Sequence, residues 1–415
     1  MTIDILSDDA LLEIFHFYRV VVYHDVLRWW WWKLLTNVCR RWRHIIFAAQ
    51  HSLDLGVVCT NRTPTRKSVD IWPPFPIKIF CYSELLDDEG QDNLIAALEH
   101  QDRVVEIDIG LLKRFAFETS PAVTQKPFPV LTFLKLSSID GMVLPEEFLR
   151  GSAPHLRELH LQNIAYPAFP KLALSTTHLF RLSLYSIPIT GYISPEAMAT
   201  CLSTLPSLKY LIIEFQSPRS RPDRIGPPPP THAALPALTF FMFRGVSEYL
   251  EDLVSRIDTP ALTWFEMQLF MDLMFHIPQL HKFIARTKQI RRKDKATIVF
   301  YSFGAQMTLG DNEVHLMIKC KKPDWQASSM VQVCTQLSPL LSHVKLLRIR
   351  EYRAAQVWKG NDIDTTLLFE LFDHFPAAQE LYISGELKPL IAQALQEPAG
   401  ARAMEVLPAL RNLFL

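Results

Sequence analysis

The sequence predicts an α/β protein in which a small all-α helical module is followed by an irregular solenoid, with parallel strands on the concave face and helices or loops on the convex face. Two observations lead to this prediction. Apolar residues recur at helical spacing within residues 1–55, and a spacing typical of short buried strands recurs across residues 94–415. Residues 56–93 lie between the two patterns and are predicted to form an extended connector.

Composition and charge narrow the class of protein. With 415 residues, of which 49% are hydrophobic and 21% charged, the chain has the make-up of a folded protein of ordinary composition. Lysine and arginine together number 43, as do aspartate and glutamate, so the formal net charge is zero. Proteins that bind nucleic acid or anionic membranes usually carry a basic surplus, and we therefore expect neither partner.

The cysteines and the apolar stretches predict an intracellular protein. The six cysteines are scattered and none lies in a C-x-x-C pair, which favours reduced, buried thiols over disulfides or a zinc site. Residues 1–9 lack the apolar stretch of a signal peptide, and the apolar residues 20–35 are interrupted by His24, Asp25, Arg28 and Lys33. We expect no membrane span, and a location in the cytoplasm, the nucleus or both.

The N-terminal residues are predicted to form short amphipathic helices. Ser7 can cap the first helix, and Asp8 and Asp9 complement its dipole. Apolar residues then recur at helical spacing in two stretches: Leu11, Leu12, Phe15 and Tyr18, followed by Leu34, Leu35, Val38, Trp42, Ile45 and Ile46. A unit of about 45 residues cannot bury a core of its own, so some of this surface should face a neighbour. That neighbour could be the domain that follows, which the helices would cap, or a separate partner.

The same residues resemble the F-box, the helical module that joins a substrate receptor to a cullin-based ubiquitin ligase. The matching residues, in order, are Leu6, Leu11, Leu12, Ile14, Phe15, Val38, Cys39, Arg40 and Trp42. Ser7 stands where F-box sequences usually have proline, and residues 20–32 form an insert of the kind seen in large fungal F-box families. The resemblance implies docking on a Skp-type adaptor through Leu6, Leu11, Leu12, Ile14, Phe15, Val38, Cys39 and Trp42, and a link to cullin through that adaptor.

Four consecutive tryptophans, residues 29–32, lie in the insert. Consecutive residues of a helix point in different directions, so one helix cannot bury all four side chains. We expect them to pack under a loop against the neighbouring domain, with a ligand-binding cage as the alternative.

A proline followed by apolar residues at the second, fifth and seventh positions recurs along the rest of the chain. The clearest copies begin at Pro129, Pro154, Pro206, Pro236, Pro260 and Pro408; weaker copies, named by their first apolar residue, begin at Val104, Leu179, Leu280, Val344 and Ala378. The apolar part of this spacing is L-x-x-L-x-L, which places a short strand with alternate side chains pointing inward. The pattern therefore predicts a leucine-rich-repeat-like solenoid.

Two stretches interrupt the repeats. Residues 217–231 are rich in proline and are predicted to be a surface loop, which a proline-binding domain could recognise. Residues 286–335 are predicted to be an irregular insertion with a hairpin, because two strand-like runs, Thr297–Phe303 and Glu313–Lys319, are separated by Gly304 and by Gly310-Asp311-Asn312.

The motifs of common enzymes are absent from the sequence. It contains no phosphate-binding glycine loop, no G-x-S-x-G and no H-E-x-x-H, so we expect no catalytic residue, no metal ligand and no cofactor. His276 and His281 are spaced wrongly for two ligands on one helical face. Basic residues cluster within 282–295 and are interpreted as a solvated loop; a nuclear-import signal or a contact with an acidic substrate are the alternatives.

Together these features predict a two-part adaptor and not an enzyme. By the F-box resemblance, the chain would be the substrate-recognition subunit of a Skp–cullin–F-box type E3 ubiquitin ligase, with the repeats holding an unknown protein substrate. The alternative is a repeat-type interaction module unconnected to ubiquitin, in which residues 1–50 cap the solenoid.

Overall fold

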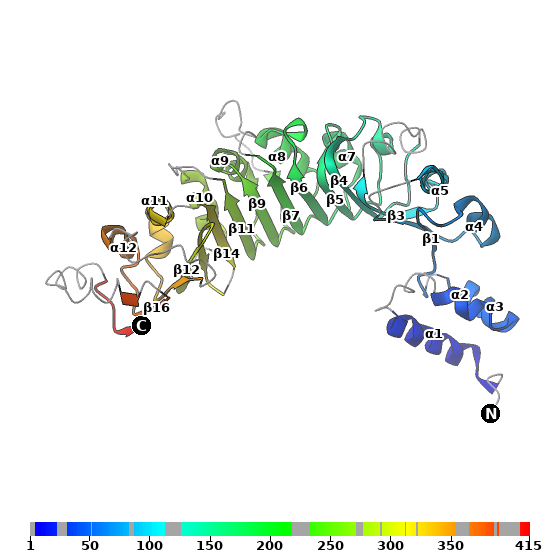
Figure 1. The fold of residues 1–415 in the computed structure, drawn as a ribbon, viewed down its shortest axis with the longest axis horizontal. Helices are drawn as coiled ribbons and strands as arrows, with labels where there is room; N and C mark the ends of the chain where they lie inside the picture. The colour runs from blue at the N-terminus through cyan, green and yellow to red at the C-terminus, as the bar shows by residue number, and fades with distance from the viewer. Residues whose placement is uncertain are drawn as a thin grey trace. The chain divides into compact units, whose positions relative to one another are not determined.

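The computed structural model describes residues 5–22, 31–50, 52–82, 87–112, 126–217, 233–270, 277–290, 293–311, 313–320, 323–352, 365–385, 388–389 and 407–415. Trp29, Trp30, His276 and nearly all of the proline-rich stretch 217–231 lie outside these residues. The chain divides into two compact units, Met1–Thr176 (unit 1) and Thr177–Leu415 (unit 2). Figure 1 shows the elements of each unit.

Unit 1 begins with three helices, which we call the helical module: α1 (Asp8–Val22), α2 (Trp31–Thr36) and α3 (Arg40–Ala48). Each of the three contacts the other two. The Ser7 side chain accepts the backbone N–H of Ala10 at 3.2 Å, as expected of a helix cap. Before α3, the Cys39 sulfur accepts the N–H of Trp42 at 3.5 Å, so the thiol takes the place of the usual hydroxyl or carboxylate cap.

Unit 1 continues as a parallel sheet. Its strands are β1 (Val57–Cys59), β2 (Ile77–Cys81), β3 (Val104–Leu112), β4 (Phe133–Val143) and β5 (Glu158–Ala165), each paired in parallel with the next. The connections include α4 (Thr65–Ile71), α5 (Asp88–Leu98) and the 3-10 helix η3 (Phe148–Gly151), and α7 (Phe169–Ser175) follows β5. The prediction of an extended connector over residues 56–93 is therefore wrong: these residues supply the first two strands of the sheet and most of two helices.

Unit 2 has a larger, mostly parallel sheet. Its strands lie in the order β6 (Arg181–Ile187), β7 (Tyr210–Phe215), β9 (Phe240–Gly245), β11 (Trp264–Leu269), β14 (Val314–Lys319), β13 (Gly304–Leu309), β12 (Lys295–Tyr301), β15 (Leu346–Glu351), β16 (Glu380–Ser384) and β17 (Asn412–Phe414). Two short strands, β8 (Ala233–Ala234) and β10 (Ile257–Asp258), pair separately. The 3-10 helix η4 (Ile189–Gly191) follows β6.

Helices form a second layer in unit 2. They are α8 (Pro195–Ser203), α9 (Ser247–Arg256), α10 (Pro278–Arg286), α11 (Pro323–Leu341) and α12 (Thr365–Phe372). Each helix contacts the next one in this series, and α8, α9 and α10 lie along the same side of the strands (Figure 1). None of the helices in the described part of the chain is long and apolar enough to cross a membrane. This mixed α/β arrangement of parallel strands and stacked helices is consistent with a leucine-rich-repeat-like solenoid.

The repeated apolar spacing marks the strands correctly at nearly every copy. In the copy that begins at Pro129, Leu131, Leu134 and Leu136 are completely buried around β4. All six clear copies lead into strands, namely β4, β5, β7, β9, β11 and β17. The weak copy at Leu280 is wrong, because Leu280 and Phe283 are buried on helix α10. An apolar residue followed by another three positions later also fits a helix, and the spacing alone does not separate the two.

The irregular stretch of unit 2 joins the sheet. Strand β12 is antiparallel to β13, and β13 is antiparallel to β14, while β14 and β12 pair in parallel with β11 and β15. The predicted hairpin therefore has a third strand, β13, which the sequence pattern missed. Most residues of β13 are buried, so it lacks the alternation of polar and apolar residues that identifies a half-buried strand.

The buried Glu251 and the partly exposed Arg286 join helices α9 and α10. The Glu251 carboxylate of α9 accepts the backbone N–H groups of Gln279 and Leu280, both at 2.7 Å, at the start of α10. The Arg286 side chain of α10 donates to the carbonyl oxygens of Val254 and Ile257, at 2.7 and 2.5 Å, where α9 ends. Each helix thus supplies the hydrogen-bond partners that the end of its neighbour lacks.

Burial raises the pKa of Glu251 from 4.5 to about 7, although the two N–H groups act in the opposite direction. Between about pH 4.5 and pH 7 the folded protein therefore holds a proton that the unfolded chain has lost. This contribution to stability is complete below pH 4.5 and is lost as the pH rises through 7. We expect Glu251→Gln to flatten the dependence of the free energy of unfolding on pH across this window, by up to about 1.4 kcal/mol per pH unit, in denaturant titrations at several pH values. The matched control is Glu196→Gln at an exposed position of α8; parallel profiles for wild type and Glu251→Gln would refute the assignment.

Candidate functional site

The interior of the helical module is built from its aromatic and aliphatic residues. Leu11 and Phe15 of α1 are completely buried, and Trp42 of α3 is almost so. The rings of Phe15 and Trp42 meet edge to face with centroids 5.0 Å apart. Ile45 and Ile46 complete the buried face of α3. These side chains hold the three helices together.

Arg41 fixes the start of α3 against the start of α1. Its Nη2 donates to the carbonyl oxygen of Leu6 at 2.5 Å and to Asp8 Oδ1 at 2.7 Å, and its Nε donates to the same carboxylate oxygen at 3.0 Å. An exposed ion pair usually adds little stability. The several bonds made by one guanidinium group do, however, define the geometry of the contact between the two helices.

A second set of apolar side chains points away from this interior. Ile14 and Phe17 on α1 are 45% and 71% exposed, and Leu34 of α2 and Val38 of the turn after it are 52% and 57% exposed. We call these four residues the docking group. On α1, Leu11 and Phe15 face inward while Ile14 and Phe17, three positions apart, face outward, so the helix has two apolar stripes.

The structure separates the predicted partner-binding residues into two classes. Leu11, Phe15 and Trp42 are buried inside the module. Ile14, Val38 and Cys39 are exposed, and Leu6 and Leu12 are half-buried. The Cys39 sulfur already caps α3.

Two members of the docking group, Phe17 and Leu34, were missed by the sequence reading, as was the exposed Ile5. Their spacing offered a signal: Phe17 lies three residues after Ile14, and Leu34 lies four residues before Val38. The F-box pattern specifies no residue type at these two positions and therefore does not predict them.

An aromatic cluster joins the helical module to the first strands. The buried Trp32 donates its indole N–H to the carbonyl oxygen of Gly56 at 3.2 Å, just before β1. Its ring centroid lies 5.0 Å from that of Trp72, 5.5 Å from that of Phe75 and 6.4 Å from that of Phe47. The expected packing of the tryptophan insert against the neighbouring domain is thereby confirmed for Trp32.

Lys33 lies beside this cluster. Its Nζ is 5.1 Å from the ring centroid of Trp72, within the range of a cation–π contact. Burial lowers the pKa of Lys33 to about 8, against a smaller opposing effect of Cys59.

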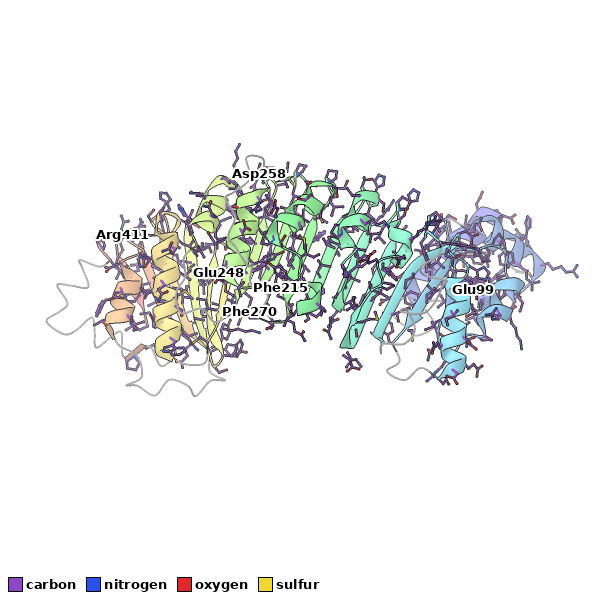
Figure 2. The ribbon with its side chains drawn as sticks, turned by 90° about the horizontal axis from the view of Figure 1, so that it is seen from above. Glu99, Phe215, Glu248, Asp258, Phe270 and Arg411 are labelled. Carbon is purple, nitrogen blue, oxygen red and sulfur yellow. The ribbon has the colours of Figure 1, made fainter. Side chains whose placement is uncertain are left out.

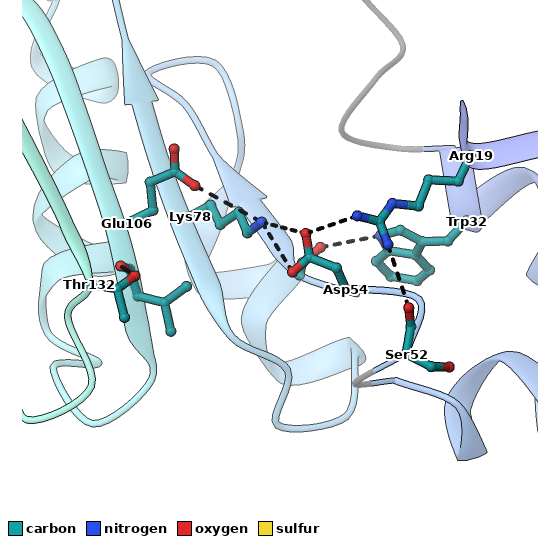
Figure 3. A network of polar contacts seen from close by, with 9 residues as sticks. Arg19, Trp32, Ser52, Asp54, Lys78, Glu106 and Thr132 are labelled. Atoms are coloured by element: carbon teal, nitrogen blue, oxygen red, sulfur yellow. Dashed lines mark hydrogen bonds and ion pairs between the residues drawn. The ribbon is translucent and has the colours of Figure 1, made fainter. Parts of the chain in front are cut away.

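Polar contacts add a second link between the module and the sheet (Figure 3). Asp54 Oδ2 lies 3.7 Å from Arg19 Nη2 of α1 and 3.3 Å from Lys78 Nζ of β2. Arg19 also donates to the carbonyl oxygen of Ser52 at 3.5 Å. Lys78 Nζ in turn lies 4.0 Å from Glu106 Oε2 of β3. One carboxylate thus connects the first helix with the second strand.

The described residues contain no group of three or more histidine, cysteine, aspartate or glutamate side chains that could hold a metal ion. The five cysteines of the sheets and their helices are buried, and Cys39 is exposed. The helical module presents exposed apolar side chains, and its buried side chains hold the three helices together.

Comparisons with known proteins leave the family open. No protein-family model matches the sequence, and no curated protein matches it. Among solved structures, the chain is similar to a leucine-rich-repeat protein of Leptospira interrogans, with 12% sequence identity and a TM-score of 0.24 over 81% of this chain and 89% of that one. The repeat architecture described above is supported by strand register and burial, and the function is inferred from the residues of this chain.

The Trp32 cluster makes a testable contribution to stability. We expect Trp32→Ala to lower the free energy of unfolding by about 3–5 kcal/mol, because it removes a large buried ring and leaves a cavity. Phe17→Ala is the matched control: it also removes an aromatic ring from the module, but an exposed one, and should change stability by no more than about 0.5 kcal/mol. Chemical denaturation monitored by circular dichroism measures both. Equal effects of the two substitutions would contradict the packing described here.

Proposed function

We propose that this protein is a substrate-recognition adaptor of a Skp–cullin–F-box type E3 ubiquitin ligase. The helical module docks on the Skp-type adaptor, which links it to cullin, and the repeats hold a target protein. The chain itself carries out no bond chemistry in this proposal. It raises the effective concentration of the target beside a separately bound conjugating enzyme. The proposed location is the cytoplasm, the nucleus or both.

The observation that carries the proposal is the docking group. The interior of the module is already filled by Leu11, Phe15 and Trp42, yet Ile14, Phe17, Leu34 and Val38 remain in solvent. Burying one such side chain fully contributes about 1.5–3 kcal/mol, so a few of them suffice for a specific interface. The F-box resemblance of the surrounding residues indicates which partner covers them.

The docking group also sharpens the predicted site. Ile14 and Val38 belong both to the family pattern and to the exposed set, so they are the strongest candidates for direct contact. Leu6 and Leu12 are half-buried and contribute at the edge. Leu11, Phe15 and Trp42 act by holding α1 and α3 in place.

A second candidate function keeps the module but removes the ubiquitin link. Trp32 packs on Trp72 and Phe75, as it would if residues 1–50 were a cap that seals the first strands of a repeat-type interaction module. Deleting residues 1–50 does not separate the two functions, because the loss of Trp32 would destabilise the strands in either case. Substitutions confined to exposed side chains do separate them.

We expect the double variant Phe17→Asp and Val38→Asp to lose co-purification of the Skp-type adaptor while its melting temperature stays close to that of the wild type. Charged side chains at these exposed positions remain hydrated in the free protein but are costly to bury in an apolar interface. The measurement is adaptor recovery with tagged protein expressed in cells, with thermal denaturation alongside.

The matched control is Phe303→Asp, which places the same charge at an exposed aromatic position of unit 2 and should leave adaptor recovery unchanged. Undiminished recovery with the Phe17 and Val38 double variant would refute docking through this surface. If the wild-type protein recovers no adaptor, the cap function replaces the proposed one.

A further inference from the structure

The strands of unit 2 carry an ordered row of aromatic side chains on the side that is not buried. Register places Tyr210 opposite Phe240 and Phe240 opposite Trp264 on β7, β9 and β11. Their ring centroids are 6.1 Å apart in each step, and Trp264 stacks on His315 of β14 at 4.8 Å. All four side chains are half-buried, so part of each remains exposed to solvent. We call the side of the unit 2 strands that carries these alternate side chains the outer face.

Basic residues outnumber acidic ones on the outer face. The basic side chains are Arg181, Arg244, Lys295, Lys319, Arg348 and Arg350, and the acidic ones are Glu214, Glu266 and Glu380. The chain as a whole has no net charge. The basic surplus is thus concentrated on one surface and balanced elsewhere.

Some of these charges are neutralised within the protein. Arg244 Nη1 lies 2.5 Å from Glu214 Oε1, and Lys295 Nζ lies 2.9 Å from Asp311 Oδ1. By contrast, Arg348 and Arg350 of β15 have no carboxylate within 4.0 Å among the residues that the structure describes. They are two positions apart on one strand, so both point to the outer face, about 7 Å apart along the strand.

The Arg348 side chain packs against an aromatic pair on the neighbouring strands. The guanidinium carbon lies 5.3 Å from the ring centroid of Tyr382 on β16, and that ring stacks on Phe414 with centroids 4.2 Å apart. A guanidinium group held against an aromatic face keeps its N–H fork free for a carboxylate.

Lys319 lies near Arg244 and Glu214 on the outer face. Burial lowers the pKa of Lys319, and the positive charge of Arg244 lowers it further. The guanidinium carbon of Arg244 lies 5.8 Å from the ring centroid of Phe270. Phe270, which is labelled in Figure 2, directly follows β11.

The strands of unit 1 lack this surplus. Lys78 pairs with Asp54 and Glu106, and Lys135 Nζ lies 3.3 Å from the Asp108 carboxylate. Each of these lysines already has an acidic neighbour. The open arginines are a feature of unit 2 and not of the repeat pattern in general.

We propose that the outer face of strands β7 to β16 binds an acidic peptide segment that also carries aromatic or aliphatic side chains. This inference rests on the proposed function, of which it names the substrate class. Carboxylates of the segment bind Arg348 and Arg350 through paired hydrogen bonds, while its apolar side chains lie against the row from Tyr210 to Trp264. A nucleic acid fits less well, because it carries a phosphate at every nucleotide, whereas Arg244 and Lys295 on this face are already paired with carboxylates.

A fluorescein-labelled random copolymer of glutamate and tyrosine tests the inference. In fluorescence anisotropy with the full-length protein at low salt, we expect saturable binding that weakens as sodium chloride is raised. The double charge reversal Arg348→Glu and Arg350→Glu should weaken binding at least about tenfold. Trp264→Ser should weaken binding of the copolymer but leave that of polyglutamate unchanged.

The control for charge is Lys288→Glu, which reverses an exposed charge beyond the end of α10 and should leave binding unchanged. An equal loss with Lys288→Glu, or tighter binding of a labelled oligothymidylate than of the copolymer, would overturn the inference. The Phe17 and Val38 double variant should still bind the copolymer. If that variant loses the adaptor and keeps the copolymer, the two surfaces act separately; if the wild type binds copolymer but no adaptor, only the proposed function fails.

Discussion

Alternation along the strands is the constraint on which the rest of the structure depends. Successive side chains of a strand point to opposite sides, so an apolar residue at every second position buries one side and leaves the other open. In β9, Phe241 and Phe243 are completely buried while Phe240 and Arg244 lie on the outer face. Parallel pairing in register then aligns the inward residues of neighbouring strands into one core. The inward positions are restricted by packing, whereas the outward positions are available for binding.

The helices follow from the same arrangement. Two neighbouring parallel strands need a connection that returns the chain to the edge of the sheet at which both strands begin. In unit 2 most of these connections contain a helix, and each helix packs on the following helix. The ends of such helices leave backbone groups without partners. Glu251 and Arg286 supply partners across the junction of α9 and α10, at the cost of burying the Glu251 carboxyl group. Antiparallel β13 fits into this series because β14 and β12, on either side of it, run in the common direction.

Much of the sheet could be predicted from the sequence, because burial by alternate apolar residues leaves a periodic trace. The copies at Pro129, Pro206 and Pro236 each mark a strand. The copy at Leu280 fails since a helix can present the same short spacing. Strand β13 escapes detection since polar and apolar residues do not alternate regularly along it. The strands within residues 56–93 escape detection for a related reason: β1 has only three buried residues and is too short to show a period, and prolines directly precede β2.

The exposed side of the helical module is harder to predict from the sequence than the strands are. A family pattern records which residues recur but not the direction in which their side chains point. Leu11 and Phe15 match that pattern as well as Ile14 does, yet only Ile14 is exposed. The direction depends on the phase of α1 relative to α3, which the Phe15–Trp42 contact and the bonds of Arg41 determine. These are contacts between residues far apart in the sequence. For a helix with two apolar stripes, the exposed stripe can therefore be identified only once the packing of the neighbouring helices is known.

The net charge of the chain does not show how charge is distributed, because it is a sum over all surfaces. From equal numbers of acidic and basic residues we expect no binding of nucleic acid or of anionic membranes. Yet the strands of unit 1 pair Lys78 and Lys135 with carboxylates, while those of unit 2 leave Arg348 and Arg350 open. What decides the partner is the charge left uncompensated on one face, and this depends on register. Arg348 and Arg350 share the outer face because they are two residues apart on one strand, and a shift of one residue would turn both inward.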